Sequence, residues 1–239
     1  MVVGVTPSPN DALPSETDPE TDPATGPATG PASAPMTPQQ YGVGARFTLS
    51  VYDSDYVAII LGALAETDAT GLVVETGDIS TFVTGPEQRV LAYLRDVVVT
   101  AASSGAHLSA SILLSRGCPG ELQCALPLGT TALGAHPVSL GESGVRARAH
   151  WSLYPLLDGI AQDGTAASTD HMAPIYAAIE RAKTEGVYSG SDHYATRLDG
   201  DLAAVLQTAA NAWIGVGETV QHVVTHLTVS INSPSTIRD

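Results

Sequence analysis

The sequence contains an internal repeat, and this repeat restricts the possible folds more than any other feature. A shift of 115 residues superimposes identical residues at six positions: Gly71 and Gly186, Thr81 and Thr196, Gly85 and Gly200, His107 and His222, Ser115 and Ser230, and Pro119 and Pro234. Upstream, a shift of 104 residues aligns 47–50 with 151–154, and the difference of 11 residues indicates an insertion within 162–170. Because the apolar pattern repeats as well, we expect two copies of one structural unit.

Each copy is predicted to contain the same order of strands and helices. In the first copy, 46–52 alternate polar and apolar residues as a half-buried strand does, and 56–67 has apolar residues at helical spacing. There follow two strands at 72–75 and 79–84 around the Gly77–Asp78 turn, a helix between Gly85 and Gly105, and a strand at 107–115. The second copy repeats this βαββαβ order over 147–154, 171–185, 187–190, 193–198, 201–217 and 221–230.

The order βαββαβ is typical of the ferredoxin-like (ACT-like) unit. We therefore predict an α+β fold of tandem ferredoxin-like repeats, with antiparallel sheets and helices on one face. The last strand of the first copy places Leu108, Ala110, Ile112 and Leu114 on one side, and His107, Ser109, Ser111 and Ser115 on the other. The helix-free face is thus semi-polar, which favours packing on another sheet, often in an oligomer, or binding of a ligand.

The composition of the first residues differs from that of the rest. Residues 1–38 hold nine of the 16 prolines, five acidic residues and no Lys or Arg. Such a segment cannot bury enough apolar surface to offset its chain entropy. We predict a disordered Pro/Thr/Ala-rich tail at 1–40, a first repeat at 41–121, a linker at 122–145 and a second repeat at 146–235.

Net charge and apolar runs exclude several classes of protein. The formal net charge is -15, which argues against nucleic acid as a partner because such binding needs a basic surface. No run of apolar residues approaches the 18 needed to span a membrane. Two cysteines, Cys118 and Cys124, provide no disulfide framework. These features predict a cytoplasmic protein without membrane insertion.

Motifs of common enzymes are missing from the sequence. There is no G-x-S-x-G, no P-loop with Lys and no G-x-G-x-x-G between a strand and a helix. Cys118 follows a strand in a turn rich in Gly and Pro, which favours a structural cysteine over a nucleophile. His222 and His226 are four apart on a predicted strand, roughly 13 Å, too far for one metal ion. We expect no catalytic residue, no metal and no cofactor.

The third strand of each copy begins with a polar segment. These two segments are 76–81 in the first copy and 191–196 in the second. Their hydroxyls and carboxylates offer hydrogen bonds to a ligand, but Asp, Ser and Thr also stabilise turns, and the spacing alone does not separate these functions. His107 and His222 occupy equivalent positions, where each could bond within its sheet face or to a ligand.

Several motifs resemble the YkoF family of thiamine/hydroxymethylpyrimidine-binding proteins. They are YVAIILGAL at 56–64, DIST at 78–81, SRGCPG at 115–120, HWSLYP at 150–155, HYAT at 193–196 and LDGD at 198–201. The resemblance covers both copies. It implies tandem ferredoxin-like halves, a homodimer, one ligand site in each half and no catalytic activity.

On this resemblance, the expected ligand is thiamine or its hydroxymethylpyrimidine part. The candidate site residues are Ser50, Tyr56, Asp78, Ser80, Thr81 and His107 in the first half, and Tyr154, Asp192, His193, Tyr194, Thr196 and His222 in the second. We expect the first site to bind more tightly because Asp78 supplies a carboxylate where the second has His193. The alternatives are an ACT-like regulatory subunit acting through a partner enzyme or transporter, and, more weakly, a hydrolase or isomerase with His107 or His222 as base.

Overall fold

Both halves of the chain fold in the βαββαβ order in the computed structural model, which describes residues 36–118, 126, 133–156 and 172–235. The first half contains β1 (Gly44–Val51), α1 (Tyr56–Glu66), β2 (Val73–Thr76), β3 (Thr81–Thr84), α2 (Glu87–Ala102) and β4 (Leu108–Arg116). The second half contains β5 (Arg146–Leu156), α3 (Ala173–Thr184), β6 (Tyr188–Asp192), β7 (Ala195–Asp201), α4 (Leu202–Val216) and β8 (His222–Ile231). The predicted tail at 1–40, apart from 36–40, and the predicted insertion within 162–170 lie outside the described residues.

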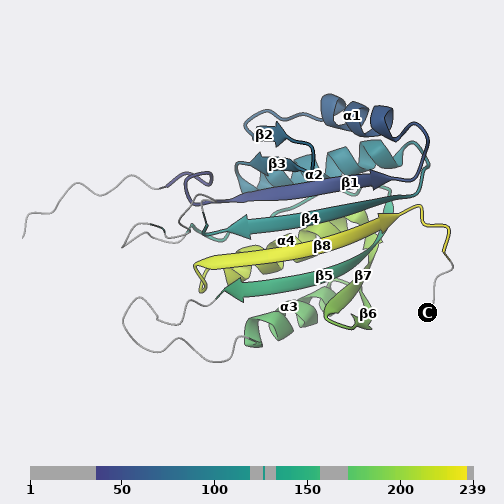
Figure 1. Cartoon of the computed structure of the whole chain (residues 1–239). Helices are drawn as coiled ribbons and strands as arrows, with labels where there is room; N and C mark the ends of the chain where they lie inside the picture. Colours follow the sequence, from purple (N-terminus) through teal and green to yellow (C-terminus); the bar gives the residue numbers. More distant parts are fainter. Residues whose placement is uncertain (1–35, 119–125, 127–132, 157–171, 236–239) are drawn as a thin grey trace, which may run out of the picture. The chain divides into compact units, whose positions relative to one another are not determined.

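All strands join one antiparallel sheet in the order β2-β3-β1-β4-β8-β5-β7-β6 (Figure 1). The fourth strands of the two halves, β4 and β8, pair along the whole of β4, from Leu108 opposite Ile231 to Arg116 opposite Val223. The predicted fold is confirmed, with one difference. The sequence predicts a separate sheet in each half, whereas the β4–β8 pairing merges the two into a single sheet.

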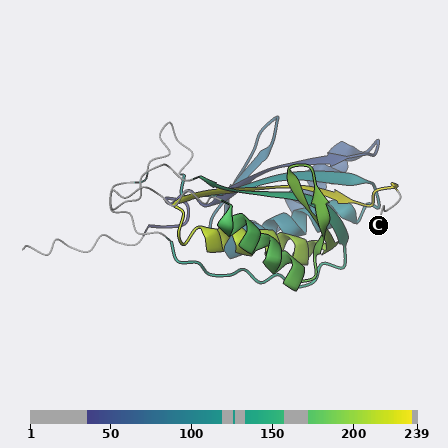
Figure 2. The same cartoon turned by 90° about the horizontal axis from the view of Figure 1, so that it is seen from below.

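The helices cover one face of this sheet and leave the other free of helices (Figure 2). Burial alternates along the central strands as the sequence predicts, with Leu108, Ala110, Ile112 and Leu114 of β4 fully buried. In β8, Val223, Leu227 and Val229 are fully buried in the same way. We call the helix-free side the open face.

The predicted linker at 122–145 is held against helix α4 in the part that the structure describes. The side-chain amide of Asn211 accepts from the Val138 N–H at 2.8 Å and donates to its carbonyl at 3.2 Å. The Gln207 side chain accepts from the Leu140 N–H at 2.8 Å. Polar side chains of α4 therefore replace the sheet partners that an extended segment would otherwise need.

Arg116 ends β4 with a fully buried guanidinium. It donates to the Ile214 carbonyl at 3.1 Å and the Leu133 carbonyl at 2.9 Å, and it lies 5.7 Å from the centre of the Tyr41 ring. The Glu87 carboxylate is 3.9 Å away. Burial of a charge requires such partners, and the side chain thereby joins β4, α4 and the linker.

The carboxylate of Asp201 connects the linker to the start of α4. It accepts from the N–H groups of Gly144 and Ala203, both at 2.8 Å, and from the Ser143 hydroxyl at 2.9 Å. Burial alone would raise the pKa of Asp201, but the bonds from Ser143, Ala203 and Gly144 together outweigh it and lower the pKa. Asp201 is thus the N-cap of α4, and it also fixes the loop before β5 through its bonds to Ser143 and Gly144.

We predict that Asp201→Ala lowers the free energy of unfolding by about 1–2 kcal/mol at pH 7, because a charged helix cap is lost. Because the folded-state pKa lies below the ordinary value of 3.8, the contribution of Asp201 is present above that pH and disappears as the pH falls through the lowered pKa. Urea unfolding at several pH values measures this difference. Glu142→Ala, which removes an exposed carboxylate from the same loop, is the control.

Candidate functional site

A row of short polar side chains crosses the open face at the end of β1. The strand register places Ser50 opposite Ser109, Ser109 opposite Ser230, and Ser230 opposite Arg148, on β1, β4, β8 and β5. These residues are exposed or half-buried. The row therefore offers hydroxyls and one guanidinium at positions fixed by the sheet.

His107 lies beside this row, just before β4. Its Nε2 is 3.4 Å from the Ser230 hydroxyl, and its ring stacks on Tyr52 with 4.7 Å between ring centres. Tyr52 remains 65% exposed, so one face of an aromatic ring is open to solvent beside the histidine. The end of β1 thus combines an aromatic ring with hydrogen-bonding groups.

The second half has an equivalent cluster at the opposite end of the central strands. Tyr154 and Leu156 of β5 pair with Val224 and His222 of β8. Under the 104- and 115-residue shifts, Tyr154 corresponds to Ser50, Leu156 to Tyr52, and His222 to His107. Both clusters contain a histidine, but their other residues differ. The first has Ser50 and Tyr52 where the second has Tyr154 and Leu156.

The tips of the hairpins β2–β3 and β6–β7 are attached to the open face by equivalent hydrogen bonds. The Thr48 hydroxyl donates to the Ile79 carbonyl at 3.1 Å, and the Ser152 hydroxyl donates to the Tyr194 carbonyl at 3.2 Å. Figure 2 shows the β2–β3 tip on the side of the sheet opposite to the helices. The internal repeat thus extends from the backbone to individual side-chain contacts.

The contacts that basic side chains make at the two hairpin tips differ. In the first half, Arg46 donates to the Ser80 hydroxyl at 3.1 Å. In the second half, the Asp192 carboxylate is 2.8 Å from His150 Nε2 and 3.6 Å from Arg197 Nε. Asp192 is therefore occupied by two basic side chains of its own sheet.

The predicted site residues lie in several different environments. On the open face or its strand ends are Ser50, Ser80, His107, Tyr154, Asp192 and His222. Thr81 and Thr196 pair with Phe47 and Trp151, and all four are buried on the helix side. Asp78 and His193 are exposed in the hairpin turns, Tyr194 is 100% exposed, and Tyr56 is 51% exposed at the start of α1. The structure does not bring all six residues of either half into one contact group.

Sequence reasoning missed four residues that connect the hairpin tips to the sheet: Arg46, Thr48, His150 and Ser152. The 104-residue shift aligns Thr48 with Ser152, both with a hydroxyl, and Arg46 with His150, both basic. The matching side-chain chemistry at these aligned positions is the sequence signal for the four residues.

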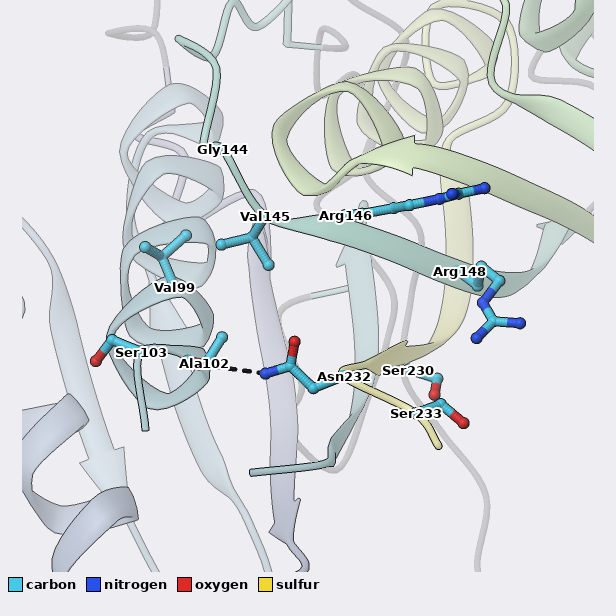
Figure 3. Close-up of a pocket in the computed structure, with 10 residues that line it drawn as sticks. All are labelled: Val99, Ala102, Ser103, Gly144, Val145, Arg146, Arg148, Ser230, Asn232 and Ser233. Carbon is cyan, nitrogen blue, oxygen red and sulfur yellow. Dashed lines mark hydrogen bonds between the residues drawn. The ribbon is translucent and has the colours of Figure 1, made fainter. Parts of the chain in front are cut away.

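A pocket of about 400 Å³ opens where α2 ends, β5 begins and β8 ends (Figure 3). It is lined by Val99, Ala102, Ser103, Gly144, Val145, Arg146, Arg148, Ser230, Asn232 and Ser233. None of the predicted site residues lines it. Ser230 connects it to the first cluster through His107.

Within the described residues, no group of three His, Cys, Asp or Glu side chains could hold a metal ion. None of the described helices is long and apolar enough to cross a membrane. Cys118 is disulfide-bonded. A single bridge is no disulfide framework, and a bonded cysteine agrees with the structural function expected of Cys118. The other cysteine, Cys124, lies outside the described residues.

The fold and its duplicated open-face clusters define a class, namely proteins with two ferredoxin-like units in one chain that share one sheet. The family model of the YkoF-related family matches residues 42–121 and 146–236, so the chain belongs to this family. A curated relative from Bacillus subtilis (strain 168), named "Putative HMP/thiamine-binding protein YkoF", is 29% identical over 197 residues. The match covers 80% of this chain and 91% of the relative.

We predict that Thr48→Val loosens the β2–β3 tip without affecting the β6–β7 tip, and that Ser152→Ala does the reverse. A neutral hydrogen bond contributes about 0.5–1.5 kcal/mol, so amide hydrogen exchange in the affected hairpin should accelerate up to about tenfold. Each variant is the control for the other. Equal acceleration in both hairpins, or none in either, would show that these bonds do not hold the tips.

Proposed function

We propose that this protein binds thiamine or its hydroxymethylpyrimidine part without catalysing a reaction, in transport, salvage or sensing of the vitamin. The observation that carries the proposal is the pair of equivalent clusters around His107 and His222 at opposite ends of the open face. The name of the Bacillus subtilis relative supports the choice of ligand. No comparison favours the regulatory-subunit alternative.

The chemistry of the first cluster suits an aminopyrimidine. Such a ring has an amino donor and ring-nitrogen acceptors, which hydroxyls and an imidazole can satisfy, and the exposed ring of Tyr52 offers a stacking surface. A site with these polar groups rejects analogues that lack the matching partners. The second cluster has Leu156 in place of Tyr52, so we propose that it binds more weakly.

Non-catalytic binding fits the surroundings of the histidines. A general base must reach the proton that it removes, and it is usually oriented by a third group. His107 bonds to Ser230 and stacks on Tyr52, and no carboxylate within ion-pair distance of it is found among the described residues. We therefore assign His107 to ligand contact. The cytoplasmic location stays a prediction, and disulfides such as that of Cys118 are commoner in oxidising compartments.

Calorimetry with thiamine, hydroxymethylpyrimidine and the isolated thiazole tests the ligand. We predict heat with the first two, competition between them, and two unequal phases for thiamine. Ser50→Ala and His107→Ala should weaken the tighter phase by about tenfold, because each removes a hydrogen bond, whereas His222→Ala should weaken the other phase. His136→Ala, in the exposed linker, is the control.

The proposal fails if neither pyrimidine ligand releases heat. If Asp78→Ala abolishes the tighter phase while Ser50→Ala and His107→Ala leave it unchanged, the ligand binds at the hairpin tip and the placement at the end of β1 is wrong.

We also propose that two copies associate through their open faces. This face exposes Leu113 and Tyr154 by 39% and 48%, and the hairpin tips expose Ile79 and Tyr194 by 79% and 100%. Exposed apolar side chains on a sheet face without helices are typical of an interface between proteins. A partner over the middle of the sheet would leave the first cluster accessible, whereas Tyr154 of the second cluster would lie at the edge of the interface.

Light scattering should therefore give about twice the chain mass of 24.5 kDa at micromolar concentration. Leu113→Glu places a charge in the centre of the open face and should produce monomers, because an unpaired buried charge opposes association. Leu61→Glu changes an equally apolar exposed residue on α1 and should leave the dimer intact. A monomeric wild-type protein, or a dimer that survives Leu113→Glu, would contradict this interface.

A further inference from the structure

The pocket of about 400 Å³ at the end of α2 has an equivalent position in the other half of the fold, and the two differ in one respect. The internal shifts relate Val99 and Ala102 of α2 to Ile214 and Gly217 of α4, and Val145 to Tyr41. In that second position Arg116 bonds to the Ile214 carbonyl and lies over the Tyr41 ring. Gly217 has no room for a Cβ, which would lie 2.7 Å from Arg116 Cδ. The guanidinium of Arg116 therefore fills the space that is open in the first half.

The first half satisfies the end of its helix with a shorter side chain. Ile231 stands where the other half has Arg116, and the next residue, Asn232, donates from Nδ2 to the carbonyls of Ala102 at 3.3 Å and Ala106 at 3.2 Å. Figure 3 shows Asn232 reaching from the end of β8 to α2. Gly105 N–H also donates to the Ala102 carbonyl at 3.0 Å. The helix end thus has donors of its own, and the remaining space is free for a ligand.

The charge that faces this space is positive. Arg146 is bound by both oxygens of Asp199, at 2.8 and 3.0 Å. The side chain of Arg148, which is half-buried, makes no hydrogen bond or ion pair with any residue in the described part of the chain. Figure 3 shows its guanidinium on the same side of the pocket as the hydroxyls of Ser230 and Ser233. An unpaired guanidinium beside hydroxyls, in a chain of net charge -15, provides a local site for an anion.

The opposite wall of the pocket is apolar. It consists of Val99 and Ala102 of α2 together with Val145 before β5. The pocket is also much larger than a single phosphate or carboxylate group, so it has room for an apolar body attached to the anionic head.

We propose that this pocket binds a small organic oxyanion, a phosphate ester or a carboxylate, with its anionic group on Arg148, Ser230 and Ser233. The apolar part of the ligand packs against Val99, Ala102 and Val145. This site adjoins the first aminopyrimidine cluster, because the Ser230 hydroxyl also lies 3.4 Å from His107 Nε2. The two proposals concern ligands of opposite charge, since a guanidinium repels the thiazolium cation of thiamine.

Titration calorimetry of the full chain at low ionic strength, with inorganic phosphate, phenyl phosphate, acetate and benzoate, tests the proposal. Phenyl phosphate should bind about tenfold more tightly than inorganic phosphate, and benzoate more tightly than acetate, because a ring buries apolar area on the valine wall. Stronger binding of phenyl phosphate than benzoate identifies a phosphate ester as the ligand, and the reverse order identifies a carboxylate.

Two variants and one control assign the binding to the pocket. Arg148→Gln should weaken phenyl phosphate or benzoate at least about tenfold, and Ser233→Ala about threefold. Arg181→Gln removes the same charge from the exposed surface of α3 and should have no effect. Thermal melting shows whether each variant is folded. If Arg148→Gln does not fold, the effect of Ser233→Ala on anion binding tests the proposal.

Equal weakening by Arg148→Gln and Arg181→Gln would mean that the anion responds only to overall charge, and the proposal would be overturned. It would also be overturned if none of the four anions bound to the wild-type protein with a dissociation constant of roughly 10 mM or lower. That value corresponds to a binding free energy of about 3 kcal/mol. A titration of thiamine into Arg148→Gln separates the two proposals, because loss of anion binding with unchanged thiamine binding leaves the aminopyrimidine clusters unaffected.

Discussion

Nine residue pairs join β4 to β8, and the arrangement of the whole sheet depends on them. Without this pairing, each half would be a four-stranded sheet with an unpaired edge at its fourth strand, and exposed edges invite association with other chains. The pairing also places Ser109 beside Ser230 and brings His107 of the first half to a residue of the second. Both the continuity of the open face and its polar row therefore follow from one antiparallel ladder.

Much of the fold is predictable from the sequence, because local periodicity determines strands, helices and buried faces. The pattern around Leu108 and Val223 correctly separates the buried face from the open one. The β4–β8 pairing was not predictable in this way, because periodicity contains no information on which distant strands become neighbours. The same reason explains why the pocket was missed, since its walls come from α2, β5 and β8, which are far apart in the sequence.

The candidate site was predicted only in part. Thr81 and Thr196 are buried on the helix side, so they could not contribute to the same surface as Ser80 and Asp192. Thr81 bonds instead to the Thr76 hydroxyl at 3.2 Å on the helix side. What the repeat did predict is the equivalence of His107 and His222. Their different neighbours, Tyr52 and Leu156, show how duplicated units can diverge in side-chain chemistry while the backbone stays the same.

The position of β8 has a consequence for biosynthesis. Among the described strands β8 comes last in sequence, yet it lies between β4 and β5 in the sheet (Figure 1). A ribosome must therefore release residues up to Ile231 before either inner edge can be covered. Until then the nascent chain presents two apolar strand edges, and closure requires contacts between residues more than a hundred positions apart, which slows folding. The sheet is therefore expected to close only after β8 has been synthesised, which makes its closure a late step of folding.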